Sequence, residues 1–229
     1  MSDEDRTYQK AKTGKPLALE ARDTVSDGRL FSPSIARNQD IVREVYSSHM
    51  PIAGTILEIA SGTGEHGANI AHALQGLTWI YSDIDADSLA SQAAWRAHKA
   101  DSAALRGPIE LDVTITDWAA AGAPTKADGM FCANMIHIAP FSAAQGLLTG
   151  AGRHLISGGR LMLYGPFARN GEIAPSNAQF SNDLKRRDTS WGVRDLDRDL
   201  VPLAKAAGLT LTEVVEMPAN NLSVIWTRD

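Results

Sequence analysis

Residues 57–67 read LEIASGTGEHG, an apolar run that passes through glycines into a segment with helical spacing. The stretch contains GTGEHG, a literal G-x-G-x-x-G, and the acidic Asp83 follows at the distance typical of a ribose contact. A strand that leads through glycines into a helix places backbone N–H groups beside a ligand at the carboxyl edge of a sheet. The stretch predicts an α/β fold with a ligand site there, and the question is whether that ligand is a nicotinamide or flavin dinucleotide.

The charges around the glycines disagree with a dinucleotide. Its pyrophosphate would lie at the helix N-terminus, but the first helical turn carries Glu65, with His66 beside it. No Arg or Lys between residues 44 and 95 offsets this carboxylate, and Glu58 near the end of the strand adds another. Acidic groups in these positions favour a ligand with an ammonium group, a sulfonium and a ribose, which is the chemistry of S-adenosylmethionine.

Acidic residues near the ends of three successive strands suggest how this cofactor is held. Gly62 and Gly64 let the backbone approach the methionine portion, Asp83 accepts from both ribose hydroxyls, and Asp112 accepts from the adenine amino group. A G-x-G string alone could encode only a tight turn. Gly67 is expected to ease helix–sheet packing. With neighbours, the predicted cofactor-binding residues are Glu58, Ala60, Ser61, Gly62, Gly64, Asp83, Ile84, Asp112, Val113, Asn134 and Met135.

The composition is typical of a soluble globular protein. Of the 229 residues, 44% are hydrophobic and 21% are charged. The net charge of −5 argues against a general affinity for nucleic acid or an anionic membrane. The basic cluster LKRRD at 184–188 is predicted to be a solvated turn or helix end. Because the sequence contains neither a signal peptide nor an apolar run of the ~18 residues that a membrane helix needs, we expect a cytoplasmic protein.

Strand and helix signals alternate along most of the chain. Ser32 and Pro33 predict a helix start with an N-cap and a proline at the first position. Strands are predicted at 55–60, 78–83, 108–113, from 128 and at 158–167, with helices at 65–75, 85–100, 141–156 and 194–209. This alternation predicts a parallel sheet with helices on both faces. The last two strands, 209–217 and 222–229, are joined only by PANN and must pair antiparallel.

The predicted architecture is one α/β domain over residues 29–229, with a seven-stranded, mostly parallel sheet and an antiparallel C-terminal hairpin. Residues 1–28 are polar and are expected to be a flexible arm or a segment ordered by ligand. Residues 165–192 are long for a structureless connection, so we expect a lid or binding loop. Asp85 or Asp87 is expected to cap a helix. Cys132, the single cysteine, is expected to be buried.

Several stretches between residues 30 and 228 together carry a family resemblance. They are LFSPSIARNQDIV, LEIASGTGEHGANIA, YSDID, LDVT, FCANMIHIAP, GLLTGAGRHL, LYGPF, SNAQF, RDTSWGVRDL and MPANNLSVIWTR. The chain resembles the class I S-adenosylmethionine-dependent methyltransferases and, within them, the DUF938 family, also called UPF0585 and methyltransferase-like 26 in animals. The resemblance implies the Rossmann-like class I fold, S-adenosylmethionine as cofactor and S-adenosylhomocysteine as product. It leaves the methyl acceptor open.

Methyl transfer is an in-line displacement, so the protein mainly aligns the reactants and excludes water. A general base is needed only if the acceptor must first lose a proton. His137, after the fourth strand, is the best candidate for a base or acceptor-orienting group; the alternative is a histidine that caps the next helix. Tyr164 in LYGPF is the second catalytic candidate, with a half-buried core aromatic as the alternative.

The acceptor is expected to bind among Asn and Arg side chains from distant parts of the chain. The predicted substrate-binding residues are Arg37, Asn38, Asn177, Trp191, Arg194, Asn220 and Asn221. For the pair in PANN, turn chemistry is the alternative. Such groups suit a small polar or zwitterionic acceptor.

Three functional hypotheses follow: a small-molecule methyltransferase, a methyltransferase that acts on protein or nucleic acid, and a non-catalytic S-adenosylmethionine-binding protein. A dinucleotide oxidoreductase is a distant fourth. CANMIH stands where amino-group nucleic-acid methylation uses an NPPY-type motif, so no nucleic-acid partner is expected. We expect no metal and no membrane partner, and either a monomer or a homodimer.

Overall fold

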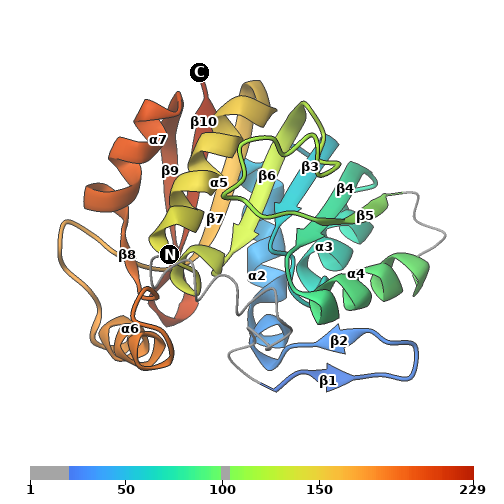
Figure 1. Ribbon diagram of the computed structural model, residues 1–229, viewed down its shortest axis with the longest axis horizontal. Coiled ribbons are helices and arrows are strands. Elements are labelled where there is room, and N and C mark those ends of the chain that lie inside the picture. Colours follow the sequence, from blue (N-terminus) through green and yellow to red (C-terminus); the bar gives the residue numbers. More distant parts are fainter. Residues whose placement is uncertain (1–20, 99–103) are drawn as a thin grey trace.

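A mixed sheet forms the centre of the structure, a computed structural model that describes residues 21–98 and 104–229. Its strands are β3 (Ala53–Ile59), β4 (Gly76–Asp83), β5 (Leu105–Glu110), β6 (Ala127–Ala133), β7 (Leu155–Ala168), β9 (Leu209–Met217) and β10 (Asn221–Arg228), and β8 (Arg194–Asp195) pairs with the end of β7. The order is β5-β4-β3-β6-β7-β10-β9 (Figure 1). β3 to β7 are parallel, and β10 is antiparallel to both neighbours. The predicted parallel sheet with its antiparallel C-terminal hairpin is confirmed.

Helices cover both faces of the sheet (Figure 1). They are α2 (Pro33–His49), α3 (Glu65–Ala73), α4 (Ala86–His98), α5 (Phe141–His154) and α7 (Val201–Ala206). A further helix, α6 (Pro175–Arg187), lies beyond the carboxyl edge of the sheet. Successive side chains of a strand point to opposite faces. Thus Ile56 of β3 belongs to the apolar core under α2, α3 and α4, and Leu57 to the core under α5 and α7. Among the described helices, none is long and apolar enough to cross a membrane.

Several local predictions are confirmed. α2 begins at Pro33 with Ser32 as its N-cap residue. Asp85 caps α4, because its Oδ2 accepts from the backbone N–H of Ser88 at 2.9 Å. The basic cluster 184–188 forms the end of α6, and Cys132 is buried.

Other segments differ from the sequence prediction. Residues 165–192 are not a structureless loop, since β7 continues to Ala168 and α6 fills much of the remainder. The strand expected at 108–113 is β5, which begins earlier and ends at Glu110. The helix expected from residue 194 starts with β8 and a π-helical turn, Leu196–Leu200, before α7.

The described part of the expected N-terminal arm is a hairpin. β1 (Asp23–Thr24) pairs antiparallel with β2 (Leu30–Phe31), and residues 1–20 lie outside the described residues. The hairpin packs on α4: Leu30 N–H donates to Ser91 Oγ at 2.8 Å, and the Arg29 guanidinium lies 4.7 Å from the Trp95 ring centroid. These contacts place residue 22 beside the carboxyl edge of the sheet.

Candidate active site

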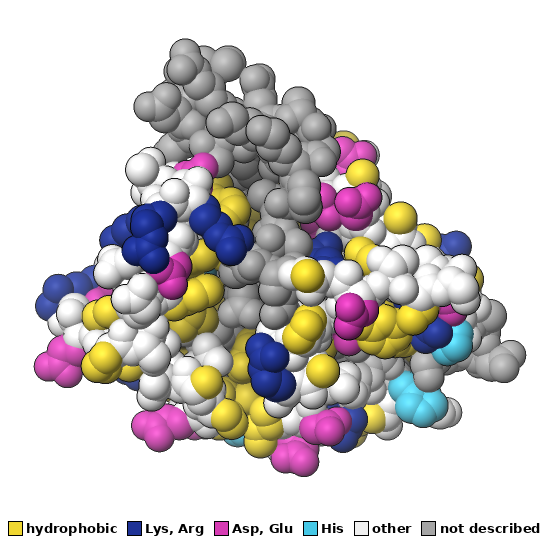
Figure 2. Space-filling view, turned by 90° about the horizontal axis from the view of Figure 1, so that it is seen from below, with side chains coloured by type: hydrophobic (Ala, Val, Ile, Leu, Met, Phe, Trp, Pro, Cys, Tyr) yellow, Lys and Arg dark blue, Asp and Glu magenta, His cyan; other side chains and the backbone are white. Residues whose placement is uncertain are grey.

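Two adjoining cavities lie at the carboxyl edge of the parallel strands. This edge is at the bottom in Figure 1 and faces the viewer in Figure 2. The smaller has a volume of about 100 Å³ and the larger about 520 Å³. They share the lining residues Arg22, Ala60, Gly62, Ala133 and Ile138. The larger cavity is within the usual size range for small-molecule sites.

The glycine loop after β3 leaves open space for a ligand. Gly62 has a φ of +56°, and a Cβ added there would meet nothing within 4 Å. Gly62 lines both cavities, so that space belongs to the site. Gly64, with a φ of +90°, lines neither; its added Cβ would lie 3.1 Å from Trp95 Cδ1. We therefore assign Gly64 to the turn and to packing on α4, and not to ligand contact.

Gly67 has the packing role expected of it. A Cβ at this position would collide with Trp79 Nε1 and lie 2.5 Å from Tyr81 Cε1 and 2.7 Å from Glu58 Oε2. The absence of a side chain thus allows α3 to sit directly on β3 and β4.

The N-terminus of α3 already holds a carboxylate from the chain itself. Glu65 is buried, and its Oε2 accepts from Ser32 N–H at 2.7 Å and from Thr63 Oγ1 at 2.8 Å. A helix N-terminus is where the pyrophosphate of a dinucleotide would bind. An acidic side chain in the first turn of α3 therefore disfavours that ligand.

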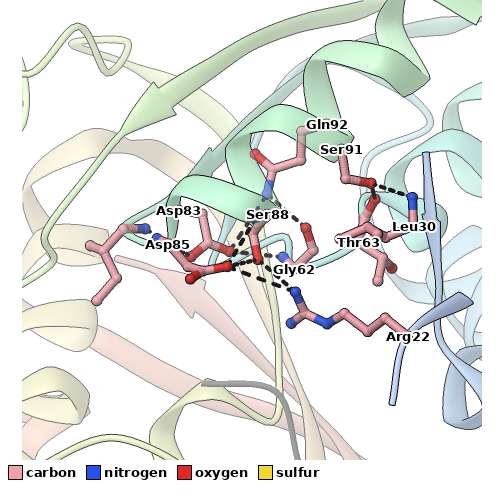
Figure 3. A network of polar contacts seen from close by, with 10 residues as sticks. Arg22, Leu30, Gly62, Thr63, Asp83, Asp85, Ser88, Ser91 and Gln92 are labelled. Atoms are coloured by element: carbon pink, nitrogen blue, oxygen red, sulfur yellow. Dashed lines mark hydrogen bonds and ion pairs between the residues drawn. The ribbon is translucent and has the colours of Figure 1, made fainter. Parts of the chain in front are cut away.

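Asp83 is held rigidly at the end of β4 (Figure 3). Its Oδ2 accepts from Gly62 N–H at 2.9 Å, and its Oδ1 accepts from the N–H groups of Ile84 and Asp85 at 2.8 and 3.0 Å. Burial raises the pKa of Asp83, and these backbone N–H groups act against that rise. A carboxylate offers about four acceptor sites, and these N–H groups use three of them, so one site remains at Oδ2. Asp83 lines the smaller cavity and can therefore receive a ligand hydroxyl there.

Arg22 reaches from the N-terminal hairpin to this acidic corner (Figure 3). Its Nη1 donates to Ser88 Oγ at 3.0 Å and lies 3.8 Å from Asp85 Oδ2. Arg22 lines both cavities and so stands at their junction. The sequence offered no signal for this role, because the residue lies in a polar segment without a motif.

The remaining wall of the smaller cavity is apolar. Its lining includes Ile59, Ile84, Leu111, Val113, Met135 and Ala143. Asp112, predicted to contact adenine, lines neither cavity. Its Oδ1 instead accepts from Thr114 N–H at 2.9 Å and Thr114 Oγ1 at 2.6 Å, so the side chain stabilises its own turn.

Glu58 is a buried carboxyl on the wall of the larger cavity. Its Oε2 accepts from Trp79 Nε1 at 2.8 Å, and burial raises its pKa to about 8. In the unfolded chain the carboxyl titrates near ~4.3. Between these two values the folded protein holds a proton that the unfolded chain has lost, so the free energy of unfolding falls as pH rises.

This linkage is testable between pH ~6.5 and about 8. Burial lowers the pKa of His66 to about 4 and that of His137 to about 3. These two shifts make the free energy of unfolding rise with pH, but only below the unfolded histidine pKa of ~6.5. They therefore do not affect the chosen window. Over the window we expect wild type to lose about 2 kcal/mol of stability. Glu58→Gln keeps an acceptor for Trp79 and should show a flatter profile in urea unfolding. Parallel pH–stability profiles of wild type and Glu58→Gln would contradict a raised pKa at Glu58.

The far wall of the larger cavity collects polar side chains from three elements. Four predicted substrate-binding residues line it: Arg37 and Asn38 of α2, Asn177 of α6 and Asn221 of β10. Tyr164 lies behind them and is 4% exposed. Its hydroxyl accepts from Asn38 Nδ2 and from Asn221 Nδ2, both at 3.2 Å. The structure thus joins Tyr164 to the site through these two amides.

The structure does not bring His137 to either cavity. The residue is fully buried, its ring packs edge-on against Phe167 at 5.0 Å, and its Nδ1 accepts from Arg194 N–H at 3.3 Å. A Cβ on Gly165 would lie 2.9 Å from His137 Nε2, so β7 covers that side. Burial keeps the ring neutral by lowering its pKa to about 3. These contacts indicate a structural residue.

Three predicted substrate residues also lie outside the cavity linings. Arg194 donates to the carbonyls of Ile136 and Ala139 at 2.9 and 2.7 Å and so holds the turn after β6. Trp191 is buried. Asn220 contacts the start of α6: its carbonyl accepts from Asn177 Nδ2 at 2.8 Å, and its Nδ2 donates to Ser176 Oγ at 2.9 Å.

Of the predicted cofactor residues, Glu58, Ala60, Ser61, Gly62, Asp83, Ile84, Val113, Asn134 and Met135 line one or both cavities. The lining also includes residues absent from the prediction: Arg22, Ser32, Ser34, Ile35, Thr63, His66, Asp85, Ser88, Ser176, Phe180 and Ala219. Most of them lie within sequence stretches quoted above, such as Ser176 and Phe180 in SNAQF, whereas Arg22 and Ser88 lie in none.

Comparison with known proteins identifies the family. A family model described as "Protein of unknown function (DUF938)" matches residues 29–228. The chain belongs to the DUF938 family. Its fold is shared with solved methyltransferases, and this confirms the predicted Rossmann-like methyltransferase fold.

Three solved structures illustrate the fold that this DUF938 chain shares with other proteins. An O-methyltransferase family protein from Burkholderia thailandensis has a TM-score of 0.70 at 17% identity, over 86% of this chain and 57% of that one. An O-methyltransferase family 2 protein from Planctomyces limnophilus DSM 3776, in complex with apigenin, has a TM-score of 0.70 at 17% identity, over 86% and 60%. CalO1, a methyltransferase in calicheamicin biosynthesis in its SAH-bound form, has a TM-score of 0.67 at 18% identity, over 86% and 54%. The DUF938 chain thus spans little more than half the length of these proteins, and at such identities the likeness concerns the fold.

Proposed function

We propose that the protein is an S-adenosylmethionine-dependent methyltransferase that acts on a small polar acceptor. The observation that carries this proposal is the corner formed by Asp83 and Gly62. A carboxylate fixed by backbone N–H groups lies beside open space at a glycine and can accept from a ribose hydroxyl, while the first turn of α3 carries the acidic Glu65, which disfavours the pyrophosphate of a dinucleotide.

The cavities fit the parts of this cofactor. The apolar wall around Ile84, Leu111 and Val113 suits adenine. Asp83 would accept from a ribose hydroxyl, and the backbone of residues 60–63 would pass along the methionine portion. The bound cofactor supplies an activated methyl group, so the chain's own task is to orient the acceptor and exclude water.

The larger cavity suits a small acceptor. Much of its far wall consists of amide, hydroxyl and guanidinium groups, which can fix the orientation of a polar molecule. Positive and negative side chains are interspersed over the visible surface of this edge (Figure 2). Among the described residues that this view shows, the charges do not form the single-sign surface that a nucleic-acid substrate favours.

Arg22 is predicted to contribute to cofactor affinity. Replacing it by glutamine removes a cation from the junction of the two cavities, and we expect the Kd for S-adenosylhomocysteine to rise about 5- to 10-fold. Arg96→Gln, the same charge change at an exposed position of α4, should leave the Kd unchanged. Equal affinities of wild type and Arg22→Gln in calorimetric titration would refute the contribution.

A screen of metabolites with S-adenosylhomocysteine release as readout tests the proposed reaction. Turnover of a small polar molecule is the expected result. Activity only on cell protein or RNA would replace the small acceptor by a macromolecule. Cofactor binding without turnover of any of these would favour a non-catalytic binding protein.

A further inference from the structure

The far wall of the larger cavity carries enough detail to define the class of acceptor. The inference deepens the proposed function and rests on it. The relevant residues are Arg37 and Asn38 on α2, Tyr164 on β7 and Asn221 on β10, which come together from distant parts of the chain.

The Tyr164 hydroxyl fixes the orientation of an amide in this wall. A tyrosine hydroxyl has one proton and two lone pairs, so at least one of two contacting amides must donate to it. Here both do, from Asn38 Nδ2 and Asn221 Nδ2. Asn38 Oδ1 is thereby turned away from Tyr164, and it is buried without a hydrogen-bond partner among the residues that the structure describes. A buried acceptor in this state is costly unless a donor satisfies it.

The neighbouring charge on this wall is positive and unbalanced. Arg37 is exposed and lines the cavity, and within residues 21–98 and 104–229 no side chain pairs with its guanidinium. Arg22, the other cation among the described lining residues, donates to Ser88 and lies 3.8 Å from Asp85 Oδ2. The carboxyl of Glu58 accepts from Trp79, and burial raises its pKa to about 8, so it offers little compensating charge at neutral pH.

We propose that the acceptor is a small amino or hydroxy acid, whose anionic group binds Arg37 and whose N–H or O–H donates to Asn38 Oδ1. Guanidinium groups bind carboxylates through paired, charge-assisted hydrogen bonds. The side-chain oxygen of Asn38 supplies the acceptor that an amine or hydroxyl requires. Arg37 and Asn38 both line the larger cavity, so one molecule bound there can contact both.

Calorimetric titration in the presence of saturating S-adenosylhomocysteine tests this assignment without need for turnover. The probes are small α-amino and α-hydroxy acids, each paired with its uncharged primary amide. At least one acid should bind wild type about tenfold or more tightly than its amide. Arg37→Gln should abolish that preference, Arg37→Lys should retain part of it, and Asn38→Leu should weaken the acid and the amide alike.

Arg43→Gln is the matched control, because Arg43 lies on the same helix, pairs with Asp40 and is outside the cavity. It should bind as wild type does. Amides that bind as well as acids, an unchanged preference in Arg37→Gln, or no binding of any acid while S-adenosylhomocysteine binds normally would each overturn the assignment. Failure of wild type to bind S-adenosylhomocysteine would instead overturn the proposed function.

Discussion

Replacing Asp83 by alanine should raise the Kd for S-adenosylhomocysteine about 100-fold. The Oδ2 atom of the carboxylate has one acceptor site left for a ribose hydroxyl, and a charge-assisted hydrogen bond contributes roughly 1.5–3 kcal/mol. The same substitution removes the acceptor that holds Gly62 N–H, which loosens the glycine loop. Calorimetric titration of purified wild type and variant gives the two constants directly.

Asp87→Ala is the control for this experiment. Asp87 is an exposed residue in the first turn of α4, so its loss changes the same charge near the same cavity without touching it. Its Kd should match that of wild type. If Asp83→Ala also bound with wild-type affinity while remaining folded, the assignment of Asp83 to the ribose would be wrong.

Gly67→Ala should destabilise the fold by about 3 kcal/mol or more. Overpacking a filled core typically costs 1–3 kcal/mol, and here the new methyl group would approach three side chains at 2.7 Å or less, two of them the fully buried Trp79 and Tyr81. These side chains sit in the core of the sheet and can move little. The shift of the urea unfolding midpoint measures the loss.

Ala73→Gly in the same helix is the control, because it changes helix propensity at an exposed position without changing the packing of α3 on the sheet. Ala73 is exposed at the end of α3, so its replacement should cost no more than about 1 kcal/mol. A Gly67→Ala variant no less stable than Ala73→Gly would show that α3 can move away from the sheet.

The sequence predicted those parts of the site that follow directly from strand ends. Asp83 and the Gly62 loop are examples, because parallel strands bring their carboxyl ends to one edge whatever the details of packing. Side chains a few residues beyond a strand were less predictable. β5 ends at Glu110, and the Asp112 carboxylate then accepts from Thr114 and lines neither cavity.

His137 and Arg22 show what a single sequence does not contain. His137 follows β6 as an active-site residue would, but a short helical turn, Met135–His137, carries its ring under Gly165 and against Phe167. Arg22 had no motif, and its place at the cavities depends on the β1–β2 hairpin packing on α4. Both outcomes depend on tertiary contacts between segments distant in sequence.

The cavities at the carboxyl edge should bind the S-adenosyl cofactor and not a dinucleotide. Calorimetric titration of the full chain with S-adenosylhomocysteine, and separately with NAD⁺ and NADH, distinguishes the two ligand classes. We expect saturable binding of one S-adenosylhomocysteine per chain, abolished or strongly weakened in Asp83→Ala, and no binding of either dinucleotide. Saturable binding of NAD⁺ or NADH with none of S-adenosylhomocysteine would contradict this expectation.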